Sequence, residues 1–397
     1  MISKKMQEAV QGSSVIRAMF EEGKKMAGLY GEENVYDFSL GNPNTPPPQE
    51  INRIIFDILQ KEKPTFVHGY MSNAGYEDVR GAIAESLNKK FSTDFGERNI
   101  IMTTGAAGGL NVILKTLLDP DDEVIVFAPF FGEYRSYTEN YSGKLVIVPP
   151  DTADFQPNLK KFEEMITEKT KAVIVNSPNN PTGVVYSETT IAKMAEILRE
   201  AQDRFDTSIY IVADEPYREL AYDGVFVPYI PRYYENTIVG YSYSKSLSLP
   251  GERIGYLVIP DTVDDFGDVL DGAVIANRIL GYVNAPSLMQ RTVAKCLDME
   301  TDVAGYNKNR EALYQGLIEA GYECIKPQGA FYLFVKSPLE NDKEFCEMAK
   351  KYHILIVPGS AFACPGYVRI AYCVSFNTVI NALPKFKELM LEIGQKG

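Results

Sequence analysis

Short apolar runs alternate with longer segments of helical periodicity between residues 100 and 260. The runs are rich in Val and Ile, and each is too short for an ordinary helix but long enough for a buried strand. They lie at Ile100–Thr104, Glu123–Ala128, Lys144–Val148, Ala172–Asn176, Ile209–Ala213, Thr237–Ser242 and Ile254–Ile259. Seven apolar strands separated mostly by helices predict an α/β fold with a mostly parallel, doubly wound sheet.

The pattern changes on both sides of this region. The first 30 residues place apolar side chains at helical spacing, which predicts one amphipathic helix. Beyond residue 265 a long helix is followed by helices and short strands, a pattern typical of an α+β domain. We therefore expect a large domain over residues 46–285 and a smaller α+β domain formed jointly by residues 1–45 and 286–397.

Charge and hydropathy narrow the range of partners. The 397-residue chain has a formal net charge of −13 and no basic run, which argues against nucleic acid as a partner. No apolar run reaches the length of a membrane span, and the N-terminal residues lack the apolar core of a signal peptide. We therefore expect a cytoplasmic protein that acts on small molecules.

Cysteine and histidine content bears on metal and disulfide chemistry. The chain has five cysteines, none in a CxxC pair, and two histidines. This content favours reduced cysteines over a disulfide framework and argues against a metal site. We expect no metal ion in the functional site.

The segment YSYSKSLSLPGERIG, residues 241–255, carries the clearest chemical signal. Lys245 follows the end of a predicted strand, where ligands bind in α/β sheets. Burial lowers the pKa of a lysine, so that its neutral amine can form a Schiff base with an aldehyde. Ser242, Ser244 and Arg253 can supply donors and charge for a phosphate. An aldehyde and a phosphate on one molecule indicate pyridoxal 5'-phosphate, a surface lysine near serines being the alternative.

Further candidates follow the ends of other strands. Gly105, Ala106 and Ala107 open a helix whose N-terminal amides can hold an anion, although close helix–sheet packing would also explain such small residues. Asp214 ends a strand, where a buried carboxylate needs a cationic partner such as a protonated pyridine nitrogen. Arg369 lies within a late apolar strand and needs an anionic partner there.

Four positions have weaker signals. Phe131 follows a strand and can either stack on a flat ring or pack in the core. Asn180 in SPNNPTG either presents an amide beyond a strand end or only fixes a turn. Gly41 precedes a proline-rich turn that can lie across a pocket mouth, a plain linker being the alternative. Tyr70 alone is typical of a surface tyrosine.

Taken in order, NPTG, DEPY, SxSK with an arginine eight residues on, and a late RIAY resemble the class I aminotransferases of the fold-type I pyridoxal phosphate enzymes. The resemblance runs from about residue 41 to residue 369. It implies that Lys245 holds the cofactor aldehyde as an internal Schiff base and that Asp214 keeps the pyridine nitrogen protonated. It also implies that Tyr217 and Asn180 bind the ring 3-oxygen.

The same resemblance implies roles for the remaining candidates. Phe131 would stack on the ring, where family members often carry tryptophan or tyrosine. Arg369, assisted by the Gly41 backbone, would clamp the substrate α-carboxylate. Tyr70 would reach the phosphate of the neighbouring subunit, which implies a two-fold homodimer with shared sites. The other expected phosphate ligands are Gly105, Ala106, Ala107, Ser242, Ser244 and Arg253.

The implied reaction is transamination with ping-pong kinetics. An amino acid displaces Lys245, which then removes the α-proton as a general base, and a 2-oxo acid such as 2-oxoglutarate closes the cycle. Aspartate is the expected amino acid, with alanine or an aromatic amino acid as alternatives. Ala107 stands where one branch of bacterial aspartate aminotransferases carries a lysine for the distal carboxylate. Arg17 and Arg278 are the remaining candidates for that carboxylate, and Arg278 is one residue out of register with the arginine of another branch. An ordinary surface arginine is the alternative for each.

Two other functions remain open at this point. A β-lyase, a γ-elimination enzyme or a decarboxylase on the same scaffold would share the lysine, the aspartate and the phosphate ligands. A pyridoxal phosphate-binding regulatory protein is a remote alternative, because it would need a DNA-binding domain for which this acidic chain has no spare segment.

Overall fold

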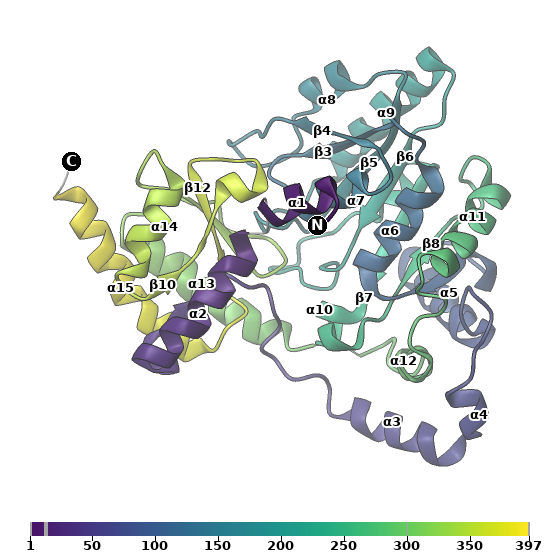
Figure 1. Cartoon of the computed structure of the whole chain (residues 1–397), viewed down its shortest axis with the longest axis horizontal. Coiled ribbons are helices and arrows are strands. Elements are labelled where there is room, and N and C mark those ends of the chain that lie inside the picture. The colour runs from purple at the N-terminus through teal and green to yellow at the C-terminus, as the bar shows by residue number, and fades with distance from the viewer. Residues whose placement is uncertain (1, 12–14, 300, 396–397) are drawn as a thin grey trace.

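The structure, a computed structural model, describes residues 2–11, 15–299 and 301–395 (Figure 1). Its central feature is a seven-stranded sheet in which six strands share one direction and one is antiparallel to its two neighbours. The strand order is β2 (Ile100–Thr103), the antiparallel β8 (Gly255–Val258), β7 (Thr237–Ser242), β6 (Tyr210–Asp214), β5 (Thr170–Asn176), β3 (Glu123–Phe127) and β4 (Lys144–Val148). The predicted α/β class and mostly parallel sheet are confirmed.

Helices cover both faces of this sheet, because successive strand residues point to opposite sides and both sets are apolar. Ile211 packs on one side and its neighbour Val212 on the other, each fully buried. The first side is covered by α5 (Glu77–Phe91), α8 (Leu159–Met165) and α9 (Glu188–Phe205). The second is covered by α6 (Gly105–Leu117), α7 (Glu133–Glu139) and α11 (Phe266–Ile279).

A second, smaller sheet is antiparallel and has its own hydrophobic core. Its strands are β11 (Val357–Pro358), β12 (Tyr367–Ala371) and β9 (Tyr332–Lys336), and its helices are α13 (Val303–Glu319), α14 (Asp342–Lys350) and α15 (Phe376–Gly394). Nearby, β1 (Tyr36–Asp37) pairs in parallel with β10 (Ile354–Leu355). The amide of Ala371 donates to the Phe38 carbonyl, so the segment that follows β1 lies beside β12.

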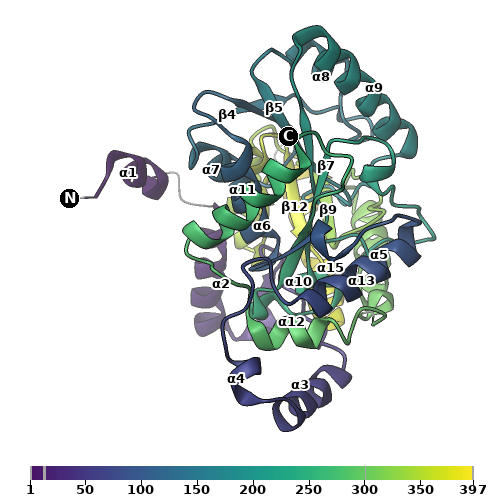
Figure 2. The same cartoon turned by 90° about the vertical axis from the view of Figure 1, so that its right-hand side faces the viewer.

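The N-terminal third contributes helices outside both sheets. The single helix expected over the first 30 residues is instead described as α1 (Lys4–Gln11) and α2 (Val15–Tyr30), and residues 12–14 lie outside the described part. Two further helices, α3 (Glu50–Lys61) and α4 (Pro64–Val67), stand away from the large sheet in both views (Figures 1 and 2). Helix α12 (Ser287–Val293) packs against α3.

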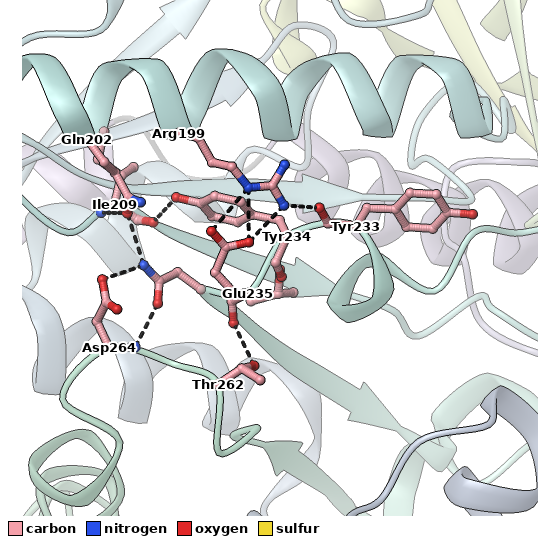
Figure 3. A network of polar contacts seen from close by, with 10 residues as sticks. Arg199, Gln202, Ile209, Tyr233, Tyr234, Glu235, Thr262 and Asp264 are labelled. Atoms are coloured by element: carbon pink, nitrogen blue, oxygen red, sulfur yellow. Dashed lines mark hydrogen bonds and ion pairs between the residues drawn. The ribbon is translucent and has the colours of Figure 1, made fainter.

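A polar network fixes the starts of β6 and β7 on the edge of the sheet opposite to their carboxyl ends (Figure 3). The Tyr234 hydroxyl donates to the Ile209 carbonyl over 2.7 Å, just before β6. The buried Asn236, just before β7, donates to Gln202 and Asp264 at 2.9 and 2.7 Å. These contacts tie α9 and the loop after β8 to the two strands that carry the chemistry at their other ends.

Candidate active site

Lys245 lies in a one-turn helix, α10 (Tyr243–Ser246), directly after β7. Ser242, the last residue of the strand, caps this turn by accepting a hydrogen bond from the Ser244 amide at 3.1 Å. The Lys245 ammonium donates to the Gly41 carbonyl at 2.8 Å. Burial lowers the pKa of Lys245 to about 8, with smaller contributions from Arg253 and Arg369. A larger fraction of this amine is therefore uncharged and nucleophilic near neutral pH than in an exposed lysine.

Asp214 ends β6, next to Asn176 at the end of β5, and is 6% exposed. Its Oδ2 accepts a 2.5 Å hydrogen bond from the Tyr134 hydroxyl, while its Oδ1 has no hydrogen-bond partner among the described residues. Burial raises the pKa of Asp214 to about 7, although the bond from Tyr134 opposes the rise. A buried carboxylate with a free oxygen favours a cationic donor beside it.

The N-terminus of α6 and the segment after α10 form a cradle for an anion. Gly105 opens α6 with a φ of +77°, and a Cβ at this position would lie 2.9 Å from the Arg253 guanidinium. The Arg253 guanidinium donates to the carbonyls of Pro250 and Thr104, at 3.0 and 3.4 Å. Ser242 and Ser244 are joined by a 2.7 Å bond between their hydroxyls. Free helix amides, two hydroxyls and a guanidinium are a donor set that suits phosphate.

Arg369 lies on β12, only 2% exposed, with its guanidinium between the rings of Tyr332 and Phe362. One terminal nitrogen donates to Asn180 Oδ1 at 3.0 Å and the other to the Ser39 carbonyl at 2.6 Å. Its Nε has no partner among the described residues. Burial lowers the pKa of Arg369, so an incoming carboxylate would relieve the desolvation of this cation.

These groups line one cavity that is open to solvent. The predicted residues on its wall are Gly41, Ala106, Ala107, Phe131, Asn180, Asp214, Tyr217, Ser242, Ser244, Lys245, Arg253 and Arg369. Gly105 adjoins this wall at the start of α6. The candidate residues, drawn from segments more than 300 positions apart, therefore meet at one site.

Several cavity residues were not predicted from the sequence, and three of them make side-chain hydrogen bonds within the site. Tyr134 bonds Asp214, and Tyr332 places its hydroxyl 2.9 Å from that of Tyr217. Asn176 bridges two site segments, because its amide donates to the Asp214 carbonyl and its oxygen accepts from the Asn180 amide, both at 2.8 Å. A sequence signal existed for Tyr134, in the segment PFFGEY, and for Asn176, the last residue of a predicted strand.

Apart from Gly105, which adjoins the wall, Tyr70 and Arg278 are the predicted residues with described side chains that do not line this cavity. Tyr70 is 93% exposed, in the loop between α4 and α5. Arg278 is exposed near the end of α11. Arg17 lies in α2, and its side chain is outside the described part of the structure. Because Tyr70 was expected to act across a subunit contact, its position within one chain leaves that prediction open, and the roles of Arg17 and Arg278 also stay predictions.

The residues of the cavity fit pyridoxal 5'-phosphate. The free Oδ1 of Asp214 matches a protonated ring nitrogen, the Gly105 cradle matches the phosphate, and Lys245 matches the aldehyde. The free Nε of Arg369 leaves a donor for a substrate carboxylate.

Comparisons with known proteins agree with this geometry. Residues 33–386 match the family model for aminotransferase class I and II. The crystal structure of an amino transferase from Eubacterium rectale is 46% identical, covers 99% of both chains and superposes with a TM-score of 0.96. An aspartate aminotransferase of Thermotoga maritima is 28% identical over 98% of this chain and 99% of its own. An aromatic-amino-acid aminotransferase of Thermococcus litoralis is 29% identical over 96% of each chain.

Proposed function

The chain belongs to the class I and II aminotransferases, and we propose that it moves the amino group of an aspartate-like L-amino acid to a 2-oxo acid such as 2-oxoglutarate. It is a pyridoxal phosphate-dependent enzyme. The observation that carries the site assignment is the meeting of Lys245, Asp214 and Arg369 on one cavity wall, two of them with an unpartnered buried atom. The Oδ1 of Asp214 suits the protonated ring nitrogen of the cofactor, and the Nε of Arg369 suits the α-carboxylate of an amino acid.

We assign the roles of the chain's own residues as follows. Lys245 would hold the cofactor through its aldehyde, and its free amine would accept the α-proton on Nζ. Asp214 holds the proton of the ring nitrogen through its free oxygen. Arg369 binds the α-carboxylate and so orients the α-proton towards Lys245. The bound cofactor supplies an electron-accepting ring that stabilises negative charge at the substrate's α-carbon.

The remaining assignments concern the ring and the phosphate. Tyr217 and the Asn180 amide donate to the ring 3-oxygen, and Phe131 packs against the ring face. The phosphate ligands are Gly105, Ala106, Ala107, Ser242, Ser244 and Arg253. This division supports the proposal because it leaves each arginine on the cavity wall one anionic partner: the phosphate for Arg253 and the α-carboxylate for Arg369.

The choice of aspartate rests on the names of relatives rather than on a residue of the cavity. Ala107 lines the cavity and offers no charge. A distal carboxylate would therefore be read by Arg17 or by Arg278 of a second subunit. An aromatic amino acid is the second candidate, supported by the name of the Thermococcus litoralis relative and by the aromatic side chains on the wall.

We also propose a homodimer with shared active sites. The exposed Tyr70 is the residue that would complete the phosphate site of the other subunit. Large apolar side chains are exposed on the helices around it, at Phe56, Leu59, Phe66, Ile275 and Ile279. Such side chains favour a subunit contact in this region.

Within the described residues, no helix is both long and apolar enough to cross a membrane. The cytoplasmic location stays a prediction.

An absorbance experiment tests the proposed reaction. The purified, cofactor-loaded protein is mixed with single amino acids, and the visible band of the Lys245–cofactor linkage is followed. We expect aspartate to convert it to the pyridoxamine form and 2-oxoglutarate to restore it, while Lys245→Ala lacks the band from the start. A band that persists while pyruvate and ammonia accumulate would instead identify a lyase.

A further inference from the structure

Tyr332 is the first residue of β9 and contacts three separate parts of the site. It is 2% exposed, and its hydroxyl lies 2.9 Å from the hydroxyl of Tyr217. Its ring centroid lies 4.7 Å from the guanidinium carbon of Arg369. A Cβ built on Gly41 would lie only 2.0 Å from the Tyr332 hydroxyl, so this residue also sets how closely the Gly41 segment approaches.

The direction of the bond between the two hydroxyls follows from counting protons. A phenol hydroxyl has one proton to donate. In the proposed function the Tyr217 proton goes to the ring 3-oxygen, so Tyr217 has none left for Tyr332. Among the described residues the Tyr332 hydroxyl has no other hydrogen-bond partner. Tyr332 is therefore the donor and Tyr217 the acceptor.

We propose that Tyr332 is a positioning residue with two separable functions. Its hydroxyl donates to Tyr217 and so directs the Tyr217 proton onto the ring 3-oxygen, and its ring holds the Arg369 guanidinium in place for the α-carboxylate. The proposal rests on the assignment of Tyr217 made above. A hydroxyl that receives a hydrogen bond becomes a stronger donor itself, and a cation over a ring face is attracted by it.

The charged and titratable groups around this pair leave both hydroxyls protonated at neutral pH. Burial raises the pKa of Tyr332 to about 12, although Arg369 from β12 opposes the rise, so its hydroxyl keeps a proton at neutral pH. Cys373, just after β12, Asp214 from β6 and Tyr134 from α7 are further titratable neighbours of the pair. Asp214 receives its own hydrogen bond from Tyr134 on Oδ2, and the proposed function assigns its Oδ1 to the ring nitrogen.

The test of the hydroxyl is a pH titration of the visible absorbance of loaded Tyr217→Phe, Tyr332→Phe and the double variant. A hydrogen bond to the anionic 3-oxygen stabilises it and weakens its hold on the proton of the neighbouring linkage nitrogen. Its loss should therefore raise the pKa of the Lys245–cofactor linkage, by about one pH unit in Tyr217→Phe. We expect Tyr332→Phe to raise it by roughly a few tenths of a unit, and to add nothing in the Tyr217→Phe background.

The test of the ring compares Tyr332→Phe with Tyr332→Leu. The probe is 2-methylalanine, which carries an α-carboxylate but no α-hydrogen and so binds without reacting. Its dissociation constant, from the absorbance change, should be the same in Tyr332→Phe as in the parent. It should rise about 2- to 30-fold in Tyr332→Leu, which keeps an apolar side chain but loses the ring.

Controls separate these effects from general damage. Tyr322→Phe removes another buried hydroxyl, which donates to Phe386 in the core of the small sheet, and should leave both measurements unchanged. Thermal unfolding of the cofactor-free variants and their affinity for added pyridoxal phosphate report on folding. If Tyr217→Phe leaves the linkage pKa unchanged, the Tyr217 assignment itself is wrong. If Tyr217→Phe shifts it but Tyr332→Phe does not, or the two shifts add, the inference about Tyr332 is overturned.

Discussion

Burial favours the neutral forms of both Asp214 and Lys245, although the two carry opposite charges in water. The pKa of the carboxyl rises to about 7 and that of the amine falls to about 8. Each group can therefore still interact with the cofactor. Asp214 can bind a cationic group, and the Lys245 amine can bond to an electrophilic carbon. Burial of the two groups prepares the cavity for its ligand, but it costs stability in the cofactor-free protein.

That cost predicts a pH dependence for Asp214→Asn. The folded pKa lies above the unfolded value of 3.8, so the stability contribution is full below pH 4 and is lost as pH rises towards 7. Cofactor-free parent should lose stability relative to Asp214→Asn across this window, by at most about 1.4 kcal/mol per pH unit. Urea unfolding of both proteins at pH 4 to 7 measures the difference. A difference that is independent of pH would contradict the burial argument.

Specificity for a distal carboxylate can be tested at Arg17 and Arg278. The residue that reads this group should, when changed to Ala, raise the KM for aspartate about 10- to 100-fold, because charge-assisted hydrogen bonds are lost. The KM for alanine, which has no distal carboxylate, should stay the same in that variant. Steady-state kinetics measure the KM for both substrates, and alanine serves as the control for aspartate. If neither variant changes the ratio of the two KM values, both residues have ordinary surface roles.

At the scale of elements, the apolar pattern predicted the large sheet well because buried strands leave continuous Val- and Ile-rich runs. Lys245 and Asp214 could be placed because they end such runs. Tyr332 could not be identified in this way, although it lies at the start of a strand. Its importance comes from the distant Tyr217 and Arg369, and a sequence pattern carries no information about contacts made across the fold. The two N-terminal helices were predicted as one although the polar segment QGSS, residues 11–14, interrupts the apolar spacing.

The start of α6 offers an element-scale prediction about the phosphate. Gly105→Ala would place a methyl group 2.9 Å from Arg253 at a φ of +77°. We expect the affinity for pyridoxal phosphate to fall about tenfold or more, since Arg253 must move away from the cradle and a charge-assisted hydrogen bond to the phosphate is worth about 1.5–3 kcal/mol. Titration of cofactor-free protein measures this. Gly224→Ala is the matched control, because its φ is +70° with open space around it. Equal losses in both variants would mean that the cradle plays no part.

At the scale of the whole molecule, two separate hydrophobic cores support the proposed division into two domains. One lies under the large sheet and the other under the small sheet. Met289 and Val293 of α12 pack in the core of the large sheet. The proposed boundary at residue 285 is therefore a minimum for the large domain, and the division 46–285 stays a prediction. The cavity lies between β12 and the ends of β5, β6 and β7, so both parts must be in place to form it.

Sharing of the site between subunits is the prediction that only the assembled molecule can test. If Tyr70 binds the phosphate of the other subunit, Tyr70→Phe should weaken the binding of pyridoxal phosphate about tenfold, the loss expected for one hydrogen bond to a charged group. Sedimentation should show that the variant assembles like the parent. If the binding of pyridoxal phosphate is weakened only in monomers, Tyr70 has a role within its own chain.

Hybrid dimers decide between the two arrangements. A Lys245→Ala subunit still offers Tyr70 to its partner, and a Tyr70→Phe subunit still offers Lys245 to its own site. When the two are mixed, dissociated and reassembled, hybrids should regain one site with parent-like cofactor affinity and the visible band of the Lys245 linkage. If Tyr70 instead served its own chain, every hybrid site would lack either the lysine or the tyrosine hydroxyl, and no high-affinity site would return. Because both variants are present in equal amounts in either case, recovery of the tight site can only come from sharing across the subunit contact.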